Sequence, residues 1–207
     1  LSPGEQSVLM RLAIFRGGFD LAAATQVAGA SLETLAGLCD KSLIRLRPGD
    51  RYDLHELLRQ FAEQQLDGAG AAAAARAAHA EYYLGFVARR DEDVKGRRQH
   101  LALFELQAEW ENIREGLLWA ADHAQYDLIT RPVLDCLTIS GEMSSRFVDI
   151  QLLFKEAEGA LRGQPGEQAA VLSDQIAIRY ERLNIFAQTG VDRDRAEAIL
   201  AHARRRG

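Results

Sequence analysis

Strand-like sequence is confined to a single short stretch of this chain, and this restriction determines the class of fold. Within residues 43–47, the apolar residues 44 and 46 alternate with arginines, and apolar and charged residues alternate again over residues 51–54, as they do in strands that bury one face. Pro48-Gly49-Asp50 between them is a sequence typical of a tight turn. The stretch therefore predicts one short β-hairpin. Apolar residues elsewhere recur at helical spacing, so the predicted fold class is mainly α.

Helices are predicted before the hairpin. Ser2 can cap the first one, because Pro3 follows at the first helical position and Glu5 stands at the capping-box spacing. Two more helices are expected near residues 21–27 and 31–42, each bounded by glycine or by a capping residue.

A fourth helix is expected to start near His55, directly after the hairpin. Its predicted apolar stripe follows helical spacing and comprises Leu54, Leu57, Leu58, Phe61, Ala62 and Leu66. Three helices, a two-stranded hairpin and a closing helix are the order of elements in a winged-helix domain. We therefore predict a winged-helix domain over residues 1–66.

The chain after residue 66 alternates between helices and turns. Asp67-Gly68-Ala69-Gly70 interrupts the helical pattern and is the predicted domain boundary. Helical hairpins at intervals of roughly 35 to 45 residues then predict an α-solenoid of tetratricopeptide-like repeats for residues 67–207. The last pair, expected near residues 168–189 and 192–206, shows the repeat spacing best, at Ala196, Leu200 and Ala203.

Composition excludes several classes of protein. The net charge is −5, no apolar run approaches the roughly 18 residues of a membrane span, and the N-terminus has no signal-peptide layout. The two cysteines, Cys39 and Cys136, lie in apolar helical contexts and predict neither a disulfide framework nor a zinc site. We expect a cytoplasmic protein without membrane association. Because the chain opens with Leu1, we also expect it to be a piece of a longer protein, cut short at its C-terminal end.

A search for the parts of an enzyme yields none. The sequence lacks a GxxxxGK phosphate loop, a GxSxG elbow, an HExxH motif and any cluster of Cys and His at metal-binding spacing. We therefore expect no catalytic residue, no metal site and no enzymatic activity in this chain. The remaining candidates are assigned to a solvated helix face (Glu105, Glu109 and Asp122) and to packing between helices (Trp110 and Trp119).

DNA binding must be considered for any winged helix. The helix that usually reads DNA, residues 31–42, has Lys41 as its one basic residue, and residues 1–66 carry a net charge of −1. DNA contact by this chain is therefore not expected. The alternative is a basic wing formed by Arg45, Arg47 and Arg51. A further alternative is a helical scaffold that binds a peptide.

His55 is the strongest single candidate for a functional residue. It is expected where the second strand joins the fourth helix, and a helix N-terminus favours an anion through its unpaired N–H groups and its dipole. A neutral imidazole can donate one more hydrogen bond to that anion. The alternative is a histidine that only fills an interface.

Three ordered blocks resemble a known family. Residues 15–19 (FRGGF), 40–43 (DKSL) and 54–62 (LHELLRQFA) are similar to the winged-helix segment that follows the nucleotide-binding core of NB-ARC-type signal-transduction ATPases. More narrowly, they resemble bacterial transcriptional regulators of the antibiotic-regulatory and LuxR-like groups. Residues 109–114 (EWENIR), continuing to 120, also resemble the helical region of those regulators. The resemblance spans about residues 1–125.

This resemblance implies a role for His55. In the family, the histidine of a Met-His-Asp motif at this junction lies against the β-phosphate of bound ADP and locks the closed state. The triplet here is Leu54-His55-Glu56, which retains the histidine but replaces Met by Leu and Asp by Glu. The longer Glu56 side chain leaves the role of the acidic residue open.

The resemblance also implies the remaining parts of the protein. The phosphate loop and the ligands for ATP or ADP and Mg²⁺ are expected upstream, in a nucleotide-binding domain of the same protein, and no cofactor is expected in this chain itself. The helical repeats are expected to receive an inducer or a partner protein. The chain is thus expected to be a non-catalytic regulatory part of a multidomain ATPase switch that controls transcription.

Overall fold

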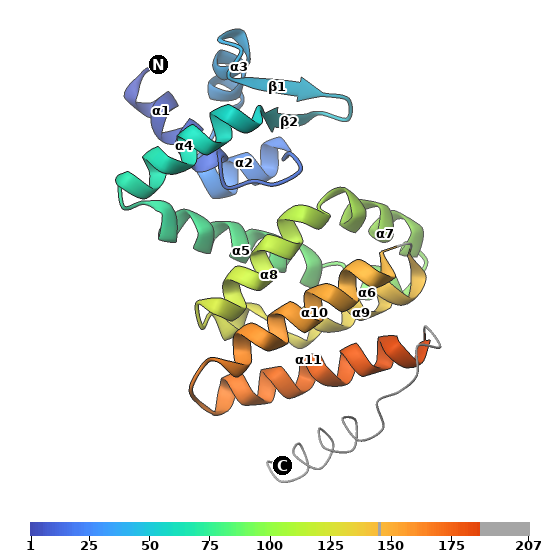
Figure 1. The fold of residues 1–207 in the computed structure, drawn as a ribbon. Coiled ribbons are helices and arrows are strands. Elements are labelled where there is room, and N and C mark those ends of the chain that lie inside the picture. Colours follow the sequence, from blue (N-terminus) through green and yellow to red (C-terminus); the bar gives the residue numbers. More distant parts are fainter. Residues whose placement is uncertain (145, 187–207) are drawn as a thin grey trace. The chain divides into compact units, whose positions relative to one another are not determined.

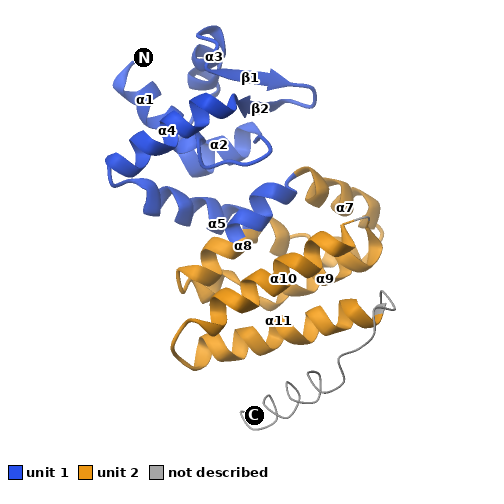
Figure 2. Cartoon of the chain, viewed as in Figure 1, with its two compact units in different colours: residues 1–83, 109–116 blue, residues 84–108, 117–207 orange. Residues whose placement is uncertain are grey.

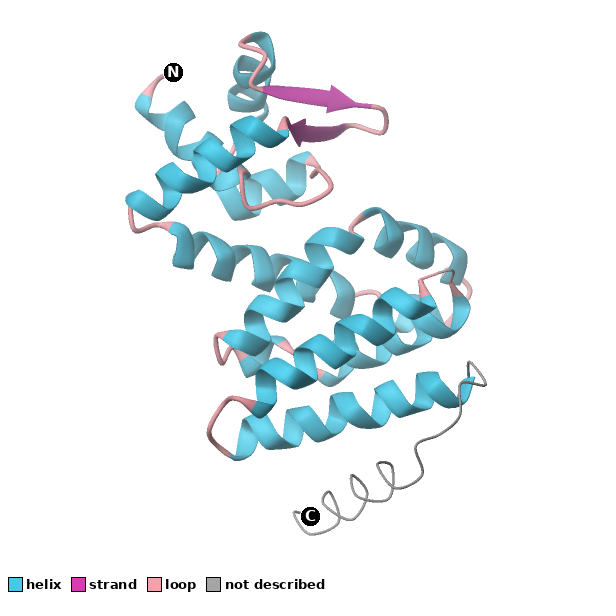
Figure 3. Ribbon diagram, in the orientation of Figure 1, coloured by secondary structure: helices cyan, strands magenta, loops and turns pink. Residues whose placement is uncertain are grey.

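The computed structural model describes residues 1–144 and 146–186 (Figure 1). These residues form a mainly helical fold with one two-stranded antiparallel sheet, as the sequence predicts (Figure 3). The chain divides into two compact units: unit 1 holds residues 1–83 and 109–116, and unit 2 holds residues 84–108 and 117 onward (Figure 2). The predicted domain boundary between residues 66 and 67 stays a prediction.

Unit 1 begins with the order of elements predicted for a winged helix. Its elements are α1 (Pro3–Leu12), α2 (Leu21–Ala28), α3 (Leu32–Asp40), β1 (Ile44–Arg47), β2 (Arg51–Leu54) and α4 (Glu56–Gly68). The capping box at Ser2 and Glu5 is confirmed, since the Ser2 hydroxyl accepts from the Glu5 N–H and the Glu5 carboxylate accepts from the Ser2 N–H.

The hairpin is joined by a third extended segment. β1 and β2 pair with Ile44 opposite Leu54 and Leu46 opposite Tyr52. Phe19 then pairs with Tyr52 through reciprocal backbone hydrogen bonds of 3.0 and 2.7 Å. The loop Phe15–Phe19 is therefore fixed to the outer edge of β2.

The apolar stripe predicted for α4 is wrong in part. Ala62 and Leu66 are buried, and Leu66 packs with Ile14 of the segment after α1. Leu57 and Phe61, however, are 70% and 60% exposed. These two side chains lie one turn apart, on the same face of α4.

The rest of the described chain is helical. It contains α5 (Ala72–Ala88), α6 (Asp91–Lys95), α7 (Gln99–Ala108), α8 (Trp110–Asp122), the 3-10 helix η1 (Tyr126–Leu128), α9 (Arg131–Met143), α10 (Phe147–Arg162) and α11 (Glu167–Phe186). In unit 2, α9, α10 and α11 pack pairwise against one another. The helix expected over residues 192–206, with Ala196, Leu200 and Ala203, lies outside the described residues.

Two burial predictions from the sequence can be compared with the structure. Trp110 is buried, as expected for packing between helices, while Trp119 is half-buried and stacks on the His123 ring. Cys39 and Cys136 are both free thiols. Across the part of the chain that is described, no helix combines the length and apolar character required to cross a membrane.

Candidate functional site

His55 lies at the N-terminus of α4, where the sequence places it. It is the N-cap residue, with φ −63° and ψ 138°, and its Nδ1 accepts from the Leu57 N–H at 3.4 Å. Because Nδ1 accepts, the neutral ring carries its proton on Nε2. His55 as a residue is exposed on unit 1.

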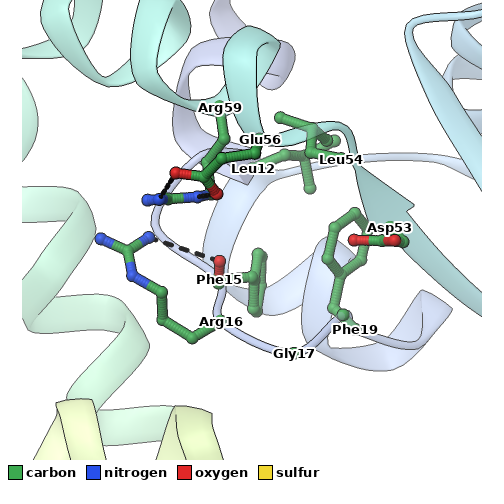
Figure 4. Close-up of a pocket in the computed structure, with 10 residues that line it drawn as sticks. Leu12, Phe15, Arg16, Gly17, Phe19, Asp53, Leu54, Glu56 and Arg59 are labelled. Carbon is green, nitrogen blue, oxygen red and sulfur yellow. Dashed lines mark hydrogen bonds and ion pairs between the residues drawn. The ribbon is translucent and has the colours of Figure 1, made fainter.

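A pocket of about 140 Å³ lies beside this junction (Figure 4). Its lining comes from the end of α1, the loop Phe15–Phe19 and the start of α4, and comprises Leu12, Phe15, Arg16, Gly17, Gly18, Phe19, Asp53, Leu54, Glu56 and Arg59. His55 is not part of the lining, although both of its neighbours in sequence are. The His55 ring and the pocket are thus adjacent but separate features.

The charged groups of the pocket neutralise one another. Arg59 binds Glu56 through two hydrogen bonds of 2.5 and 2.9 Å, and this contact raises the pKa of Arg59 and lowers that of Glu56. Arg16 binds Glu63 at 3.0 Å, and its guanidinium also donates to the Ala13 carbonyl at 2.9 Å. The pocket therefore holds no uncompensated cation that could attract a phosphate by itself.

A buried polar junction lies on the other side of the loop Phe15–Phe19, centred on Asn112 of α8. The Asn112 Oδ1 accepts from the Arg16 backbone N–H at 2.7 Å, and its Nδ2 donates to the Gly18 carbonyl at 2.9 Å. The Oδ1 also faces His79 Nε2 at 3.2 Å, and the Nδ2 also donates to Glu109 Oε2 at 3.2 Å. Since Oδ1 can only accept, His79 must carry its proton on Nε2. The Asn112 amide thus uses all four of its hydrogen bonds.

Glu109 continues the junction to the hairpin. Both of its carboxylate oxygens bind the guanidinium of Arg51 on β2, one of them at 3.2 Å. Glu109 is 6% exposed, so its assignment to a solvated helix face is wrong. It can be buried because Arg51 compensates its charge and Asn112 donates a hydrogen bond to it. Together, Arg51, His79, Glu109 and Asn112 are called the polar junction below; all four belong to unit 1.

The role of Asn112 was not predicted from the sequence, where this residue belongs only to a stretch that resembles the helical region of a known family. A signal was present: Glu109, Asn112, Ile113 and Gly116 recur at i, i+3, i+4 and i+7, the spacing of one helix face. Polar residues that share the spacing of a buried stripe point to an interior hydrogen-bond network.

The structure does not bring the three wing arginines together as an exposed basic surface. Arg51 is turned to Glu109, whereas Arg47 binds Asp53 at 3.0 Å and Arg45 is exposed. α3 is the helix that would be expected to read DNA, and Lys41 directly follows it. The Lys41 side chain binds Glu5 at 2.5 Å. Among residues 1–144 and 146–186, no group of three His, Cys, Asp or Glu side chains could hold a metal ion.

Burial of His79 predicts a pH dependence of stability. His79 is 2% exposed, and burial lowers its pKa to about 4, with the Arg16 charge acting in the same direction. As pH falls below 6.5, His79 becomes protonated in the unfolded chain but stays neutral in the folded chain. The free energy of unfolding should therefore fall by at most about 1.4 kcal/mol per pH unit between pH 6.5 and 4, and this contribution should be constant above pH 6.5.

Urea unfolding at pH 7.5, 6 and 5 tests this prediction. The control is His79→Gln, which keeps an N–H donor for Asn112 but cannot titrate. The native chain should lose more stability than this variant as pH falls. Equal losses of stability in the native chain and in His79→Gln would contradict the assignment of this pH dependence to His79.

The chain is similar to curated proteins from two strains of Mycobacterium tuberculosis and from Mycobacterium bovis. Each is designated a candidate HTH-type transcriptional regulator and is 33% identical over 133 residues. The matched segment covers 59% of this chain and 15% of each relative, so the chain spans only a small part of their length. No protein-family model and no solved structure matches the chain.

Proposed function

We propose that this chain is the regulatory part of a transcriptional regulator in which a winged helix responds to the nucleotide bound by an NB-ARC-type ATPase core. The similarity to HTH-type regulators supports the regulatory role. The observation that carries the finer proposal is His55, an exposed N-cap residue of α4 whose Nδ1 accepts from the Leu57 N–H and whose Nε2 is thus left to donate.

The residues present fit one part of a nucleotide site. The α4 N-terminus presents a partial positive charge, and the His55 ring adds a donor, so both suit a phosphate of ADP supplied by the core. The neighbouring pocket is neutral and does not hold a phosphate on its own. In this proposal, His55 stabilises the ADP-bound arrangement and nucleotide exchange releases the winged helix, as a shift between two populations.

Unit 2 supports a role in receiving an inducer or a partner. A pocket of about 400 Å³ is lined by η1 and α11, with Ile129 and Leu172 forming its buried apolar floor. Tyr126, Asp127 and Glu167 contribute polar groups around that floor. A few polar groups around an apolar floor are typical of small-molecule sites.

Replacing His55 by alanine in the full-length protein tests the nucleotide proposal. Loss of a hydrogen bond to a charged phosphate should weaken ADP retention on the order of tenfold and raise transcription from a reporter in the absence of inducer. His55→Asn is the matched control for the helix cap, because Asn is a preferred N-cap residue that lacks the imidazole ring. Wild-type ADP retention and reporter output in His55→Ala would remove His55 from the mechanism.

DNA binding through the wing remains the alternative function, and the ion pairs of Arg51, Arg47 and Lys41 weigh against it. We expect no shift of duplex DNA by the 207-residue chain at low salt. A salt-dependent shift that disappears in the Arg45→Ala/Arg47→Ala variant would favour the DNA-binding function instead. This variant spares Arg51, whose loss would disturb the polar junction.

A further inference from the structure

The loop Phe15–Phe19 connects two features of unit 1, the pocket at the α4 N-terminus and the polar junction. One side of the loop lines the pocket at the α4 N-terminus. Its backbone at Arg16 and Gly18 is hydrogen-bonded to the side chain of Asn112, 1% exposed, on α8. The position of this loop is therefore determined from α8.

A chain of contacts leads from this loop to the first turn of α4. The Arg16 guanidinium binds Glu63 Oε1 at 3.0 Å, and Arg59 binds Glu63 Oε2 at 3.2 Å. Arg59 also binds Glu56, the residue directly after His55. A displacement of the Arg16 backbone would thus disturb the ion pairs that surround the α4 N-terminus.

The α8 helix reaches beyond the unit that contains Asn112. It runs from Trp110 to Asp122, and residues from 117 onward belong to unit 2. On the unit 1 side, the close approach of Gly116 to Ala80 of α5 shows that the helix is tightly packed there.

We infer that Asn112 is a positioning residue that sets the loop Phe15–Phe19 and thereby couples the α8 helix to the α4 N-terminus. The inference rests on the proposed function for its regulatory consequence, but the positioning itself is a property of unit 1. The Asn112 side chain offers two N–H donors and one oxygen that accepts twice, which matches the four groups that it contacts. No other side-chain type of this size has that combination. The expected consequence is that a change at Asn112 alters the nucleotide response at the α4 N-terminus.

The positioning is tested with Asn112→Asp in the 207-residue chain. The variant keeps the size of the side chain but places a carboxylate oxygen against the Gly18 carbonyl and the Glu109 carboxylate, both of which require a donor. Amide hydrogen exchange at Arg16, Phe19 and Tyr52 should accelerate by roughly tenfold or more, while the amides of α10 in unit 2 should be unchanged. Glu111→Gln, an exposed position next to Asn112, is the matched control and should leave all of them unchanged.

The regulatory consequence is tested in the full-length protein by ADP retention and reporter output. Asn112→Asp should alter both, whereas Glu111→Gln should alter neither. If Asn112→Asp does not fold, Glu109→Gln replaces it, because this variant weakens the contacts to Arg51 and Asn112 while keeping one oxygen acceptor and the shape of the side chain.

The possible outcomes separate this inference from the proposed function. Unchanged exchange at Arg16 and Phe19 would overturn the positioning role, whatever happens to ADP. Accelerated exchange with normal ADP retention in Asn112→Asp, but impaired retention in His55→Ala, would overturn the coupling alone. Normal retention in both variants would overturn the proposed function and leave Asn112 as a positioning residue without a nucleotide to regulate.

Discussion

Replacing Arg51 by methionine is expected to destabilise unit 1 by about 3–5 kcal/mol, because it leaves the buried Glu109 carboxylate without its cation. Methionine retains most of the apolar stem of arginine, so the lost charge pair dominates the effect. The measurement is urea unfolding followed by the fluorescence of Trp110, which lies next to Glu109 in unit 1. A Trp119→Phe background ensures that Trp110 alone reports the transition.

The matched control is Arg47→Met, the same change on the same hairpin. The Arg47 pair with Asp53 is exposed, with side chains 55% and 36% accessible, and exposed pairs contribute at most about 1 kcal/mol. Adding Glu109→Met to Arg51→Met should recover part of the lost stability, because an apolar pair replaces the unpaired charge while Asn112 loses one acceptor. Equal losses in Arg51→Met and Arg47→Met would contradict a buried pair at the junction.

The elements of unit 1 could be predicted from the sequence because their signals are local. Pro48-Gly49-Asp50 specifies a turn whatever surrounds it, and the Ser2 capping box involves residues only three apart. His55 lies directly before α4, and this position could also be predicted from the local sequence. Its contact with a nucleotide stays a prediction, since it concerns a molecule outside this chain.

The polar junction could not be predicted in this way because its partners are distant in the sequence. Arg51 and Glu109 are separated by 58 residues, and Arg16 and Asn112 by 96. Helical spacing placed Glu109 on a solvated face because a carboxylate is expensive to bury without a partner. The error on Leu57 and Phe61 has the opposite origin: helical spacing predicts a wide apolar face for α4, but only part of that face is buried in unit 1.

Gly18→Ala should destabilise unit 1 strongly, although it adds only one methyl group to the loop Phe15–Phe19. Gly18 has φ +88°, a conformation that costs an L-residue roughly 1–2 kcal/mol, and an added Cβ would lie 2.9 Å from the Tyr52 carbonyl oxygen. That oxygen accepts the Phe19 N–H at 3.0 Å, so it cannot move away without breaking the bridge between the loop and β2. Together with roughly 1–3 kcal/mol for overpacking, the expected loss in the free energy of unfolding is about 3 kcal/mol.

Gly29→Ala separates the two contributions to this loss. Gly29 also has a positive φ, +68°, but an added Cβ would meet nothing within 4 Å. The Gly29 variant should therefore lose only the conformational part, roughly 1 kcal/mol, in the same urea unfolding measurement. The difference between the variants measures how tightly the loop is held against the Tyr52 backbone. Equal losses of stability in the two variants would mean that the β2 backbone at Tyr52 shifts to accommodate the added methyl group. The loop would then be fixed only on its other side, by Asn112.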